Sequence, residues 1–128
     1  MKILIVNFSD THDGASRATY RLHKALLVAG AESQMLVRLK SSDDFTVIGR
    51  TTWIQKLICK LQIKLDNLPV RFYKNRTKTL FSPSWVPFSS IVNRINTINP
   101  DLVHLNWFQA GMMRIEDLDK IKVPIVWS

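Results

Sequence analysis

The strongest constraint on the fold is the way the chain opens, with an apolar segment, a small polar loop and a helical pattern. Residues 2–7 form a continuous apolar run, which is typical of a parallel strand covered on both faces. A polar loop spans residues 10–17, and helical periodicity over residues 18–27 ends before Gly30. A strand–loop–helix unit of this kind opens doubly wound α/β domains, in which the loop after the first strand faces the ligand crevice.

The rest of the chain continues this alternation. Apolar runs predict strands over residues 34–39, 46–48, 101–107 and 123–127. Helical spacing predicts helices over residues 53–68, 91–98 and 115–121. The order predicts one Rossmann-like α/β domain over residues 1–128, a parallel sheet with helices on both faces. Right-handed crossovers would bring residues 8–17 and 104–113 to the same edge of that sheet.

Two of the expected helices carry an apolar stripe, the pattern of a helix that packs on a core. The first stripe consists of Ala18, Leu22, Ala25, Leu26 and Ala29. The second consists of Ile54, Leu57, Ile58, Leu61, Leu65 and Leu68. Pro69 is expected to end the second helix, because proline cannot continue the backbone hydrogen bonding of a helix interior.

The net charge of +8 is concentrated in one segment. Residues 50–80 hold eight basic residues and one acidic residue, whereas the rest of the chain holds ten and nine. Within this segment Lys56, Lys60 and Lys64 form a stripe beside the apolar one, with Trp53 at one end. The pattern fits a membrane-surface helix that binds anionic lipid, and equally a helix with one buried face and one solvated basic face. Few aromatic residues interleave the charges, so nucleic acid is disfavoured as a partner.

Composition and the pattern of apolar residues indicate the part of the cell in which the protein is expected. Hydrophobic residues make up 46% of the 128 residues and charged residues 22%, which is typical of a globular protein. No apolar run approaches the roughly 20 residues needed to span a bilayer, and the opening lacks the pattern of a signal peptide. The single Cys59 forms no disulfide framework and is interpreted as a packed hydrophobe. We therefore expect a cytoplasmic protein, at the inner face of the cell membrane if the basic helix binds lipid.

The first loop supplies three candidate substrate-binding residues, Gly14, Ala15 and Arg17. A glycine here would let the backbone approach a ligand and leave helix N–H groups free for phosphate, or would only satisfy a tight turn. Arg17 would reach a diphosphate as a fork-shaped donor, or would be a solvated residue of the first turn. His12, in the same loop, is interpreted as an exposed residue.

The exit of the 101–107 strand supplies the other candidates, His104, Asn106 and Trp107. The imidazole would hydrogen-bond a ligand, or would be a core histidine whose hydrogen bonds are satisfied within the protein. The indole would stack on a ligand ring, or would cover the sheet edge by packing. His23 lies in a helix and is interpreted as structural, and the three histidines show no metal-ligand spacing with Cys59, so no metal site is predicted.

Three segments in order along the chain resemble the family 4 glycosyltransferases of the colanic-acid-biosynthesis type. Residues 14–26, GASRATYRLHKAL, resemble that family's opening GGAARAAYRLHxAL. Residues 99–107, NPDLVHLNW, are similar to its NPDIVHLHW strand, and residues 115–128 are similar to its IEDLxKIKxPIVWT segment. The chain departs from the family at Asp13, where a second glycine stands in the motif, and at Asn106, where a histidine stands.

The resemblance implies the GT-B fold, two Rossmann-like domains that face each other across a cleft. This chain would be the N-terminal, acceptor-side domain, incomplete at its C-terminus, with the donor-binding domain absent. The full enzyme would be a retaining glycosyltransferase that moves a sugar from a nucleotide-sugar co-substrate to a cell-surface glycan or lipid-linked acceptor, without cofactor or tightly bound metal. The family's catalytic histidine would lie beyond Ser128, so this chain alone is expected to be inactive.

Two other classes are weighed against this reading. One is a non-catalytic module that binds an acceptor or a membrane, the product of a truncated or split gene. The other is a dehydrogenase of the Rossmann type, which the sequence disfavours because it contains no G-x-G-x-x-G loop and no suitably placed acidic residue after a second strand.

Overall fold

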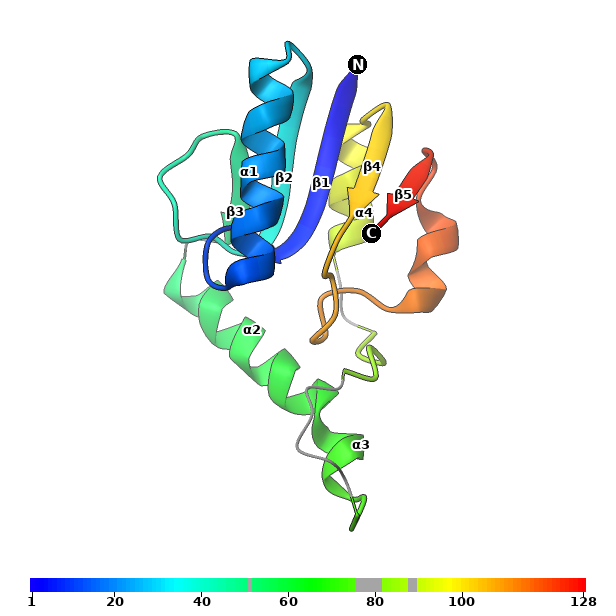
Figure 1. Cartoon of the computed structure of the whole chain (residues 1–128). Coiled ribbons are helices and arrows are strands. Elements are labelled where there is room, and N and C mark those ends of the chain that lie inside the picture. The colour runs from blue at the N-terminus through cyan, green and yellow to red at the C-terminus, as the bar shows by residue number, and fades with distance from the viewer. Residues whose placement is uncertain (51, 76–81, 88–89) are drawn as a thin grey trace.

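The computed structural model describes residues 1–50, 52–75, 82–87 and 90–128, and it confirms a Rossmann-like parallel α/β fold (Figure 1). One five-stranded sheet has the order β3-β2-β1-β4-β5, and every strand pair in it is parallel. The strands are β1 (Lys2–Ser9), β2 (Glu32–Leu39), β3 (Val47–Arg50), β4 (Leu102–Leu105) and β5 (Ile125–Trp127). The helices are α1 (Gly14–Val28), α2 (Trp53–Asp66), α3 (Leu68–Arg71), α4 (Ile91–Ile98) and the 3-10 helix η1 (Ile115–Lys120).

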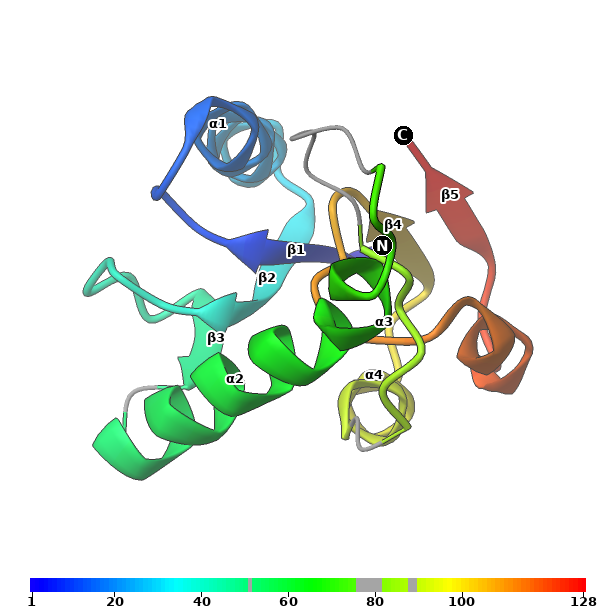
Figure 2. The same ribbon diagram turned by 90° about the horizontal axis from the view of Figure 1, so that it is seen from below.

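β1 is the centre of the sheet, paired with β2 on one side and β4 on the other. Residues 3–10 are all buried, as expected for a parallel strand covered on both faces. Helix α1 lies on one face of the sheet, and α2 and α4 lie on the opposite face (Figure 2). The larger core lies on the α4 face, where Leu4, Val103 and Leu105 pack against Ile95.

The boundaries of both long helices differ from the sequence prediction, and the predicted strand boundaries differ by up to two residues. The first helix begins at Gly14, not at residue 18, because Asp13 serves as its N-cap and accepts a hydrogen bond from the Ser16 backbone N–H at 2.7 Å. The expected helix over residues 53–68 ends at Asp66. Pro69 does not end it but lies in the first turn of the short helix α3, where a missing N–H group costs nothing.

The expected apolar face of α1 is wrong. Ala18, Ala25 and Ala29 are exposed, Leu22 is 38% exposed, and of that stripe Leu26 packs on the core. The helix turns three other residues inward: Ser16, Thr19 and His23. These polar side chains tolerate burial because each finds a hydrogen-bond partner across or within the interface.

His23 is the best example, and its structural interpretation is confirmed. Its ring is fully buried, with Nδ1 2.7 Å from the Ser33 hydroxyl and Nε2 2.7 Å from the Thr46 hydroxyl. One imidazole therefore joins α1, β2 and the residue just before β3. Burial lowers the pKa of His23, because the charged ring would lose its hydration.

The expected burial of the second apolar stripe is also wrong. Helix α2 turns Cys59, Gln62 and Asp66 inward, and its leucines and isoleucines at positions 54, 57, 58, 61 and 65 face solvent. Cys59 is buried but is more than a packed hydrophobe, since its sulfur accepts a hydrogen bond from Arg38 Nε at 2.9 Å. No helix among the described residues is long and apolar enough to cross a bilayer. Arg76 and Lys78 of the basic segment lie outside the described residues.

We predict that His23→Gln lowers the free energy of unfolding by about 1–3 kcal/mol at neutral pH, because it leaves a buried hydroxyl without its partner. It should also flatten the pH dependence of stability. The unfolded chain binds a proton at His23 more tightly than the folded chain does, so the wild type loses stability as the pH falls from about 7 to about 5. Urea denaturation across that range measures both effects. His12→Gln, in the exposed loop, is the control, and an equal pH dependence in all three proteins would contradict the prediction.

Candidate functional site

The loops that follow β1 and β4 meet at the carboxyl edge of the sheet, as the crossover rule predicts. The Asn106 backbone N–H donates to the Val6 carbonyl at 3.0 Å, and the Phe8 N–H donates to the Trp107 carbonyl at 2.8 Å. These bonds continue the β1–β4 pairing past the end of β4. The exit of β4 is therefore held directly beside the exit of β1.

Asn7 joins the two exits to the first helix. Its side chain is 1% exposed, and its Oδ1 accepts from the Trp107 N–H at 3.1 Å. Its Nδ2 donates to the Ser9 carbonyl at 2.7 Å and to the Ser16 hydroxyl at 3.2 Å. The sequence analysis missed Asn7, although an amide at the end of an otherwise apolar strand is a signal that could have found it.

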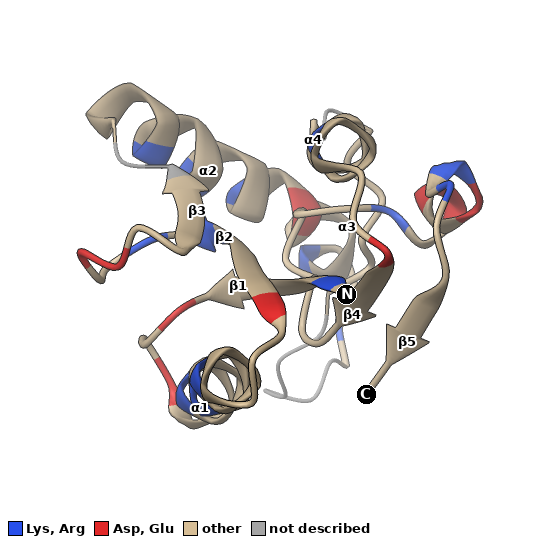
Figure 3. Ribbon diagram, turned by 90° about the horizontal axis from the view of Figure 1, so that it is seen from above, with Lys and Arg blue, Asp and Glu red and all other residues tan. Residues whose placement is uncertain are grey.

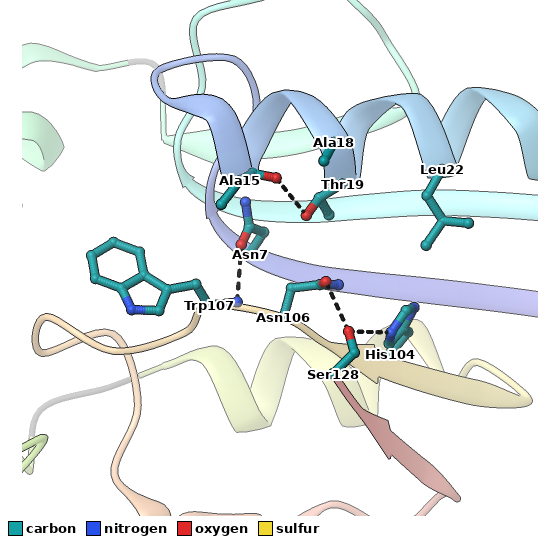
Figure 4. Close-up of a pocket in the computed structure, with 9 residues that line it drawn as sticks. All are labelled: Asn7, Ala15, Ala18, Thr19, Leu22, His104, Asn106, Trp107 and Ser128. Atoms are coloured by element: carbon teal, nitrogen blue, oxygen red, sulfur yellow. Dashed lines mark hydrogen bonds between the residues drawn. The ribbon is translucent and has the colours of Figure 1, made fainter.

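A cavity of about 360 Å³ lies next to this junction, between α1 and the ends of β4 and β5 (Figure 4). Its lining consists of Asn7, Ala15, Ala18, Thr19, Leu22, His104, Asn106, Trp107 and Ser128. The wall from α1 is mainly apolar, and the opposite wall carries amides, a hydroxyl and an imidazole. Ala15, His104, Asn106 and Trp107, all predicted from sequence, are thus brought together, whereas Gly14 and Arg17 are not part of the lining.

Three side chains form a chain of hydrogen bonds across the polar wall. The Ser128 hydroxyl donates to Asn106 Oδ1 at 3.1 Å and lies 3.0 Å from His104 Nε2. Because that hydroxyl proton points to Asn106, the imidazole in this arrangement donates its own Nε2 proton to the serine oxygen. Asn106 Nδ2 is buried and has no hydrogen-bond partner among the described residues. An unsatisfied amide donor is costly to bury, and a small rotation of the Asn106 side chain toward the cavity would let a ligand oxygen satisfy it.

Trp107 takes part in the site mainly by packing. Its ring meets Phe8 edge to face, with the ring centroids 5.3 Å apart. In Figure 4 the indole lies at the far end of the row from His104 and points away from it. The backbone of Trp107, bonded to Asn7 and Phe8, is what fixes the polar wall.

Two N–H groups at the N-terminus of α1 are bonded within the protein, whereas one interpretation of the sequence had such groups free for phosphate. Asp13 accepts from the Ser16 N–H through its carboxylate and from the Arg17 N–H through its carbonyl, so these two groups are not free for phosphate. Gly14 makes no tight turn: a Cβ built on it meets nothing within 4 Å, and its φ is not in the left-handed region. Arg17 is exposed, and its Nε donates to the Thr11 carbonyl at 3.3 Å, which closes the loop on the helix.

A buried carboxylate, also missed from sequence, stabilises the same edge on the β2 side. Asp10 is fully buried and accepts from the Ser41 N–H at 3.0 Å and from the Ser42 N–H at 2.8 Å. Burial raises the pKa of Asp10, but the hydrogen bonds outweigh burial and the net effect is a lowered pKa. The acid therefore stays ionised and ties the loop after β2 to the loop after β1.

No family model, curated protein or solved structure matches this chain. Function is therefore inferred from the pocket and from the motifs that surround it. Within the described residues, no group of three His, Cys, Asp or Glu side chains is arranged to hold a metal ion.

We predict that Asn7→Ala lowers the free energy of unfolding by about 2 kcal/mol or more, because buried partners on Trp107 and Ser16 lose their hydrogen bonds. Chemical denaturation measures the loss. Asn93→Ala is the matched control, since Asn93 is exposed on α4 and should change stability by less than about 0.5 kcal/mol. Equal effects of the two substitutions would show that Asn7 does not hold the junction together.

We predict that Gly14→Ala leaves the protein folded and raises its stability by about 0.4–1 kcal/mol, because the added methyl group meets open space and the unfolded chain loses freedom. Thermal denaturation tests this. A destabilised variant would mean that the loop needs a conformation restricted to glycine.

Proposed function

We propose that this chain is the acceptor-side domain of a retaining glycosyltransferase of the GT-B type, and that the pocket between α1 and the end of β4 binds the acceptor sugar. One observation carries the proposal. The first of the three segments that resemble the family is far from the other two in sequence, yet all three line the same pocket. Ala15 comes from the first segment, His104 and Asn106 from the second, and Ser128 from the third.

The chemistry of the pocket suits a saccharide. Sugars are neutral and offer many hydroxyl groups that both donate and accept hydrogen bonds. The polar wall offers the free Asn106 Nδ2 donor and the His104–Ser128 pair, while Ala18 and Leu22 offer apolar surface to the C–H face of a sugar ring. The carboxyl edge of a parallel sheet is also where ligands bind in open α/β folds.

In the reaction proposed, an acceptor hydroxyl oxygen forms a bond to the anomeric carbon of the donor sugar. The bond from that carbon to the nucleoside diphosphate breaks, the diphosphate leaves with the bonding electrons, and the hydroxyl proton passes to the diphosphate or to solvent. The role of this chain is to hold the acceptor in position, which removes much of the entropic cost of bringing two reactants together. The resemblance assigns the donor to a second domain, so the residues named here are positioning and binding residues.

A second candidate, a non-catalytic saccharide-binding module, is favoured by one feature of the pocket. Among the described residues that line it, His104 is the one side chain of a type that commonly serves in acid–base catalysis, and the others are amides, hydroxyls, an indole and alkyl groups. Such a set recognises a sugar without supplying an acid–base pair. Both candidates predict saccharide binding, and they differ in whether transfer follows.

We predict that Asn106→Ala and His104→Ala each weaken saccharide binding about five- to tenfold, the value of one hydrogen bond of about 1 kcal/mol or slightly more. Binding is measured by chemical-shift changes on titration with a panel of mono- and oligosaccharides. His12→Ala is the control, since His12 is exposed and is not among the residues that line the pocket.

Transfer is tested with the same saccharides and a panel of UDP- and GDP-linked sugars, with mass spectrometry to detect a glycosylated product. Binding together with transfer supports the enzyme. Binding without transfer, for the longest natural form of the protein, supports the binding module. If no saccharide shifts the pocket resonances, both candidates are wrong.

A further inference from the structure

The most unusual surface of the protein is the outer face of α2 and α3, which we call the α2–α3 face. Its large apolar side chains are each between 41% and 71% exposed: Trp53, Ile54, Leu57, Ile58, Leu61, Leu65 and Leu68. The surface continues past α3 with Phe72 and Tyr73, which are 79% and 74% exposed. Contiguous apolar surface on this scale marks a site of contact with another molecule or with a membrane.

The helix is held in this orientation by its polar underside. Arg38 on β2 is buried and donates to the Cys59 sulfur and to the Gln62 side-chain oxygen. At the other end of α2, buried Asp66 accepts from the Ser82 hydroxyl, and its carbonyl accepts from Trp85 Nε1 at 3.3 Å. Rolling the leucines inward would break these bonds and leave the Arg38 guanidinium buried without them, so the apolar face stays outward.

The charged residues beside the α2–α3 face indicate the kind of partner that it binds. Lys56, Lys60 and Lys64 are exposed along one flank of the apolar stripe, and Figure 3 shows these basic positions repeating along α2. Arg71 and Lys74 extend the basic surface, and the acid of this stretch, Asp66, is buried. Over residues 52–75 the exposed charge is therefore entirely positive.

We propose that the α2–α3 face docks this protein on the surface of an anionic lipid bilayer. The apolar stripe would enter the boundary between headgroups and acyl chains, and the lysines beside it would contact lipid phosphates. Trp53 at one end and Tyr73 at the other are side chains that favour this boundary. A helix of 14 residues is about 21 Å long, which suits a helix that lies in the membrane plane.

A second copy of the chain fits this face less well. In an antiparallel symmetric pair of α2 helices the two rows of lysine would meet, and like charges in contact oppose association; in a parallel pair neither row would gain an anionic partner. An anionic bilayer satisfies the apolar stripe and the lysines at once.

The docking face and the pocket lie toward the same end of the molecule. In Figure 1, α2 and α3 extend below the carboxyl ends of β1 and β4, where the pocket lies. Docking would therefore turn the pocket's end of the molecule toward the lipid surface, where a lipid-linked acceptor would be found, although the pocket lies on the α1 face of the sheet and α2 on the other. This last point rests on the proposed function, whereas the docking itself does not.

The test is co-sedimentation of the full chain with phosphatidylcholine vesicles that do or do not contain phosphatidylglycerol. We expect binding to the anionic vesicles at low ionic strength, little binding to neutral vesicles, and release near 1 M salt, where the screening length falls to about 3 Å. A shift of tryptophan fluorescence to shorter wavelength, lost in Trp53→Phe, would locate the contact.

Two pairs of substitutions test the two halves of the proposal, each with a matched control. Leu57→Gln with Leu61→Gln removes apolar surface from the face, and Val28→Gln with Phe45→Gln removes apolar groups elsewhere that are even more exposed. Lys60→Gln with Lys64→Gln removes two charges, and Arg21→Gln with Lys122→Gln removes two exposed charges elsewhere. We expect tenfold or greater losses of vesicle affinity in the first member of each comparison and less than twofold in the control.

The proposal is overturned if the chain binds neither vesicle, or if it binds neutral and anionic vesicles alike. It is also overturned if the leucine pair can be changed without loss, since charge alone would then explain the binding. A concentration-dependent dimer that Leu57→Gln with Leu61→Gln abolishes, without vesicle binding, would assign the face to a second copy. Saccharide binding by the pocket is measured separately, so a failure of either proposal leaves the other intact.

Discussion

The geometry of the site depends on one buried amide. Asn7 accepts from the backbone after β4 and donates to the first turn of α1 and to its own strand exit, so three elements are fixed by a single side chain. In a buried environment such bonds are strong, and the loss of one partner leaves the others unsatisfied. The polar wall of the pocket therefore has one well-defined position relative to the apolar wall, which is what recognition of a sugar hydroxyl requires.

Local patterns were enough to predict the strands, the longer helices and the parallel sheet, but not the short helix α3. The apolar run at residues 2–7 and the helix over residues 91–98 depend on spacing within a few turns, and both occur where expected. Which face of a helix is buried is a different question, because it depends on partners far along the chain. His23 is buried because Ser33 and Thr46 reach it, and α2 turns Gln62 inward because Arg38 lies beneath it. The spacing of apolar residues along a helix does not show hydrogen-bond partners that are distant in sequence.

The same reasoning explains which parts of the site could be predicted. Strand exits in a parallel sheet converge at one edge, so His104 and Asn106 could be found from their positions alone. Asn7 also stands at a strand end, but its role could not be predicted, because that role depends on a hydrogen bond to Trp107, 100 residues away. Asp13 stands where the resembled motif has a glycine, and the structure shows that its carboxylate accepts a hydrogen bond from one of the N–H groups at the helix N-terminus.

The protein therefore exposes two partly apolar surfaces, and the groups beside each indicate different ligands. In the pocket, Ala18 and Leu22 face neutral amide, hydroxyl and imidazole groups, a set that suits a neutral polyhydroxyl molecule. On the α2–α3 face the apolar stripe is bordered by lysines, a set that suits an extended anionic surface. Both surfaces have the same cause, since the buried positions of α1 and α2 hold mainly polar residues. Hydrogen bonds from these residues anchor each helix, and apolar side chains of the same helix therefore lie on the surface.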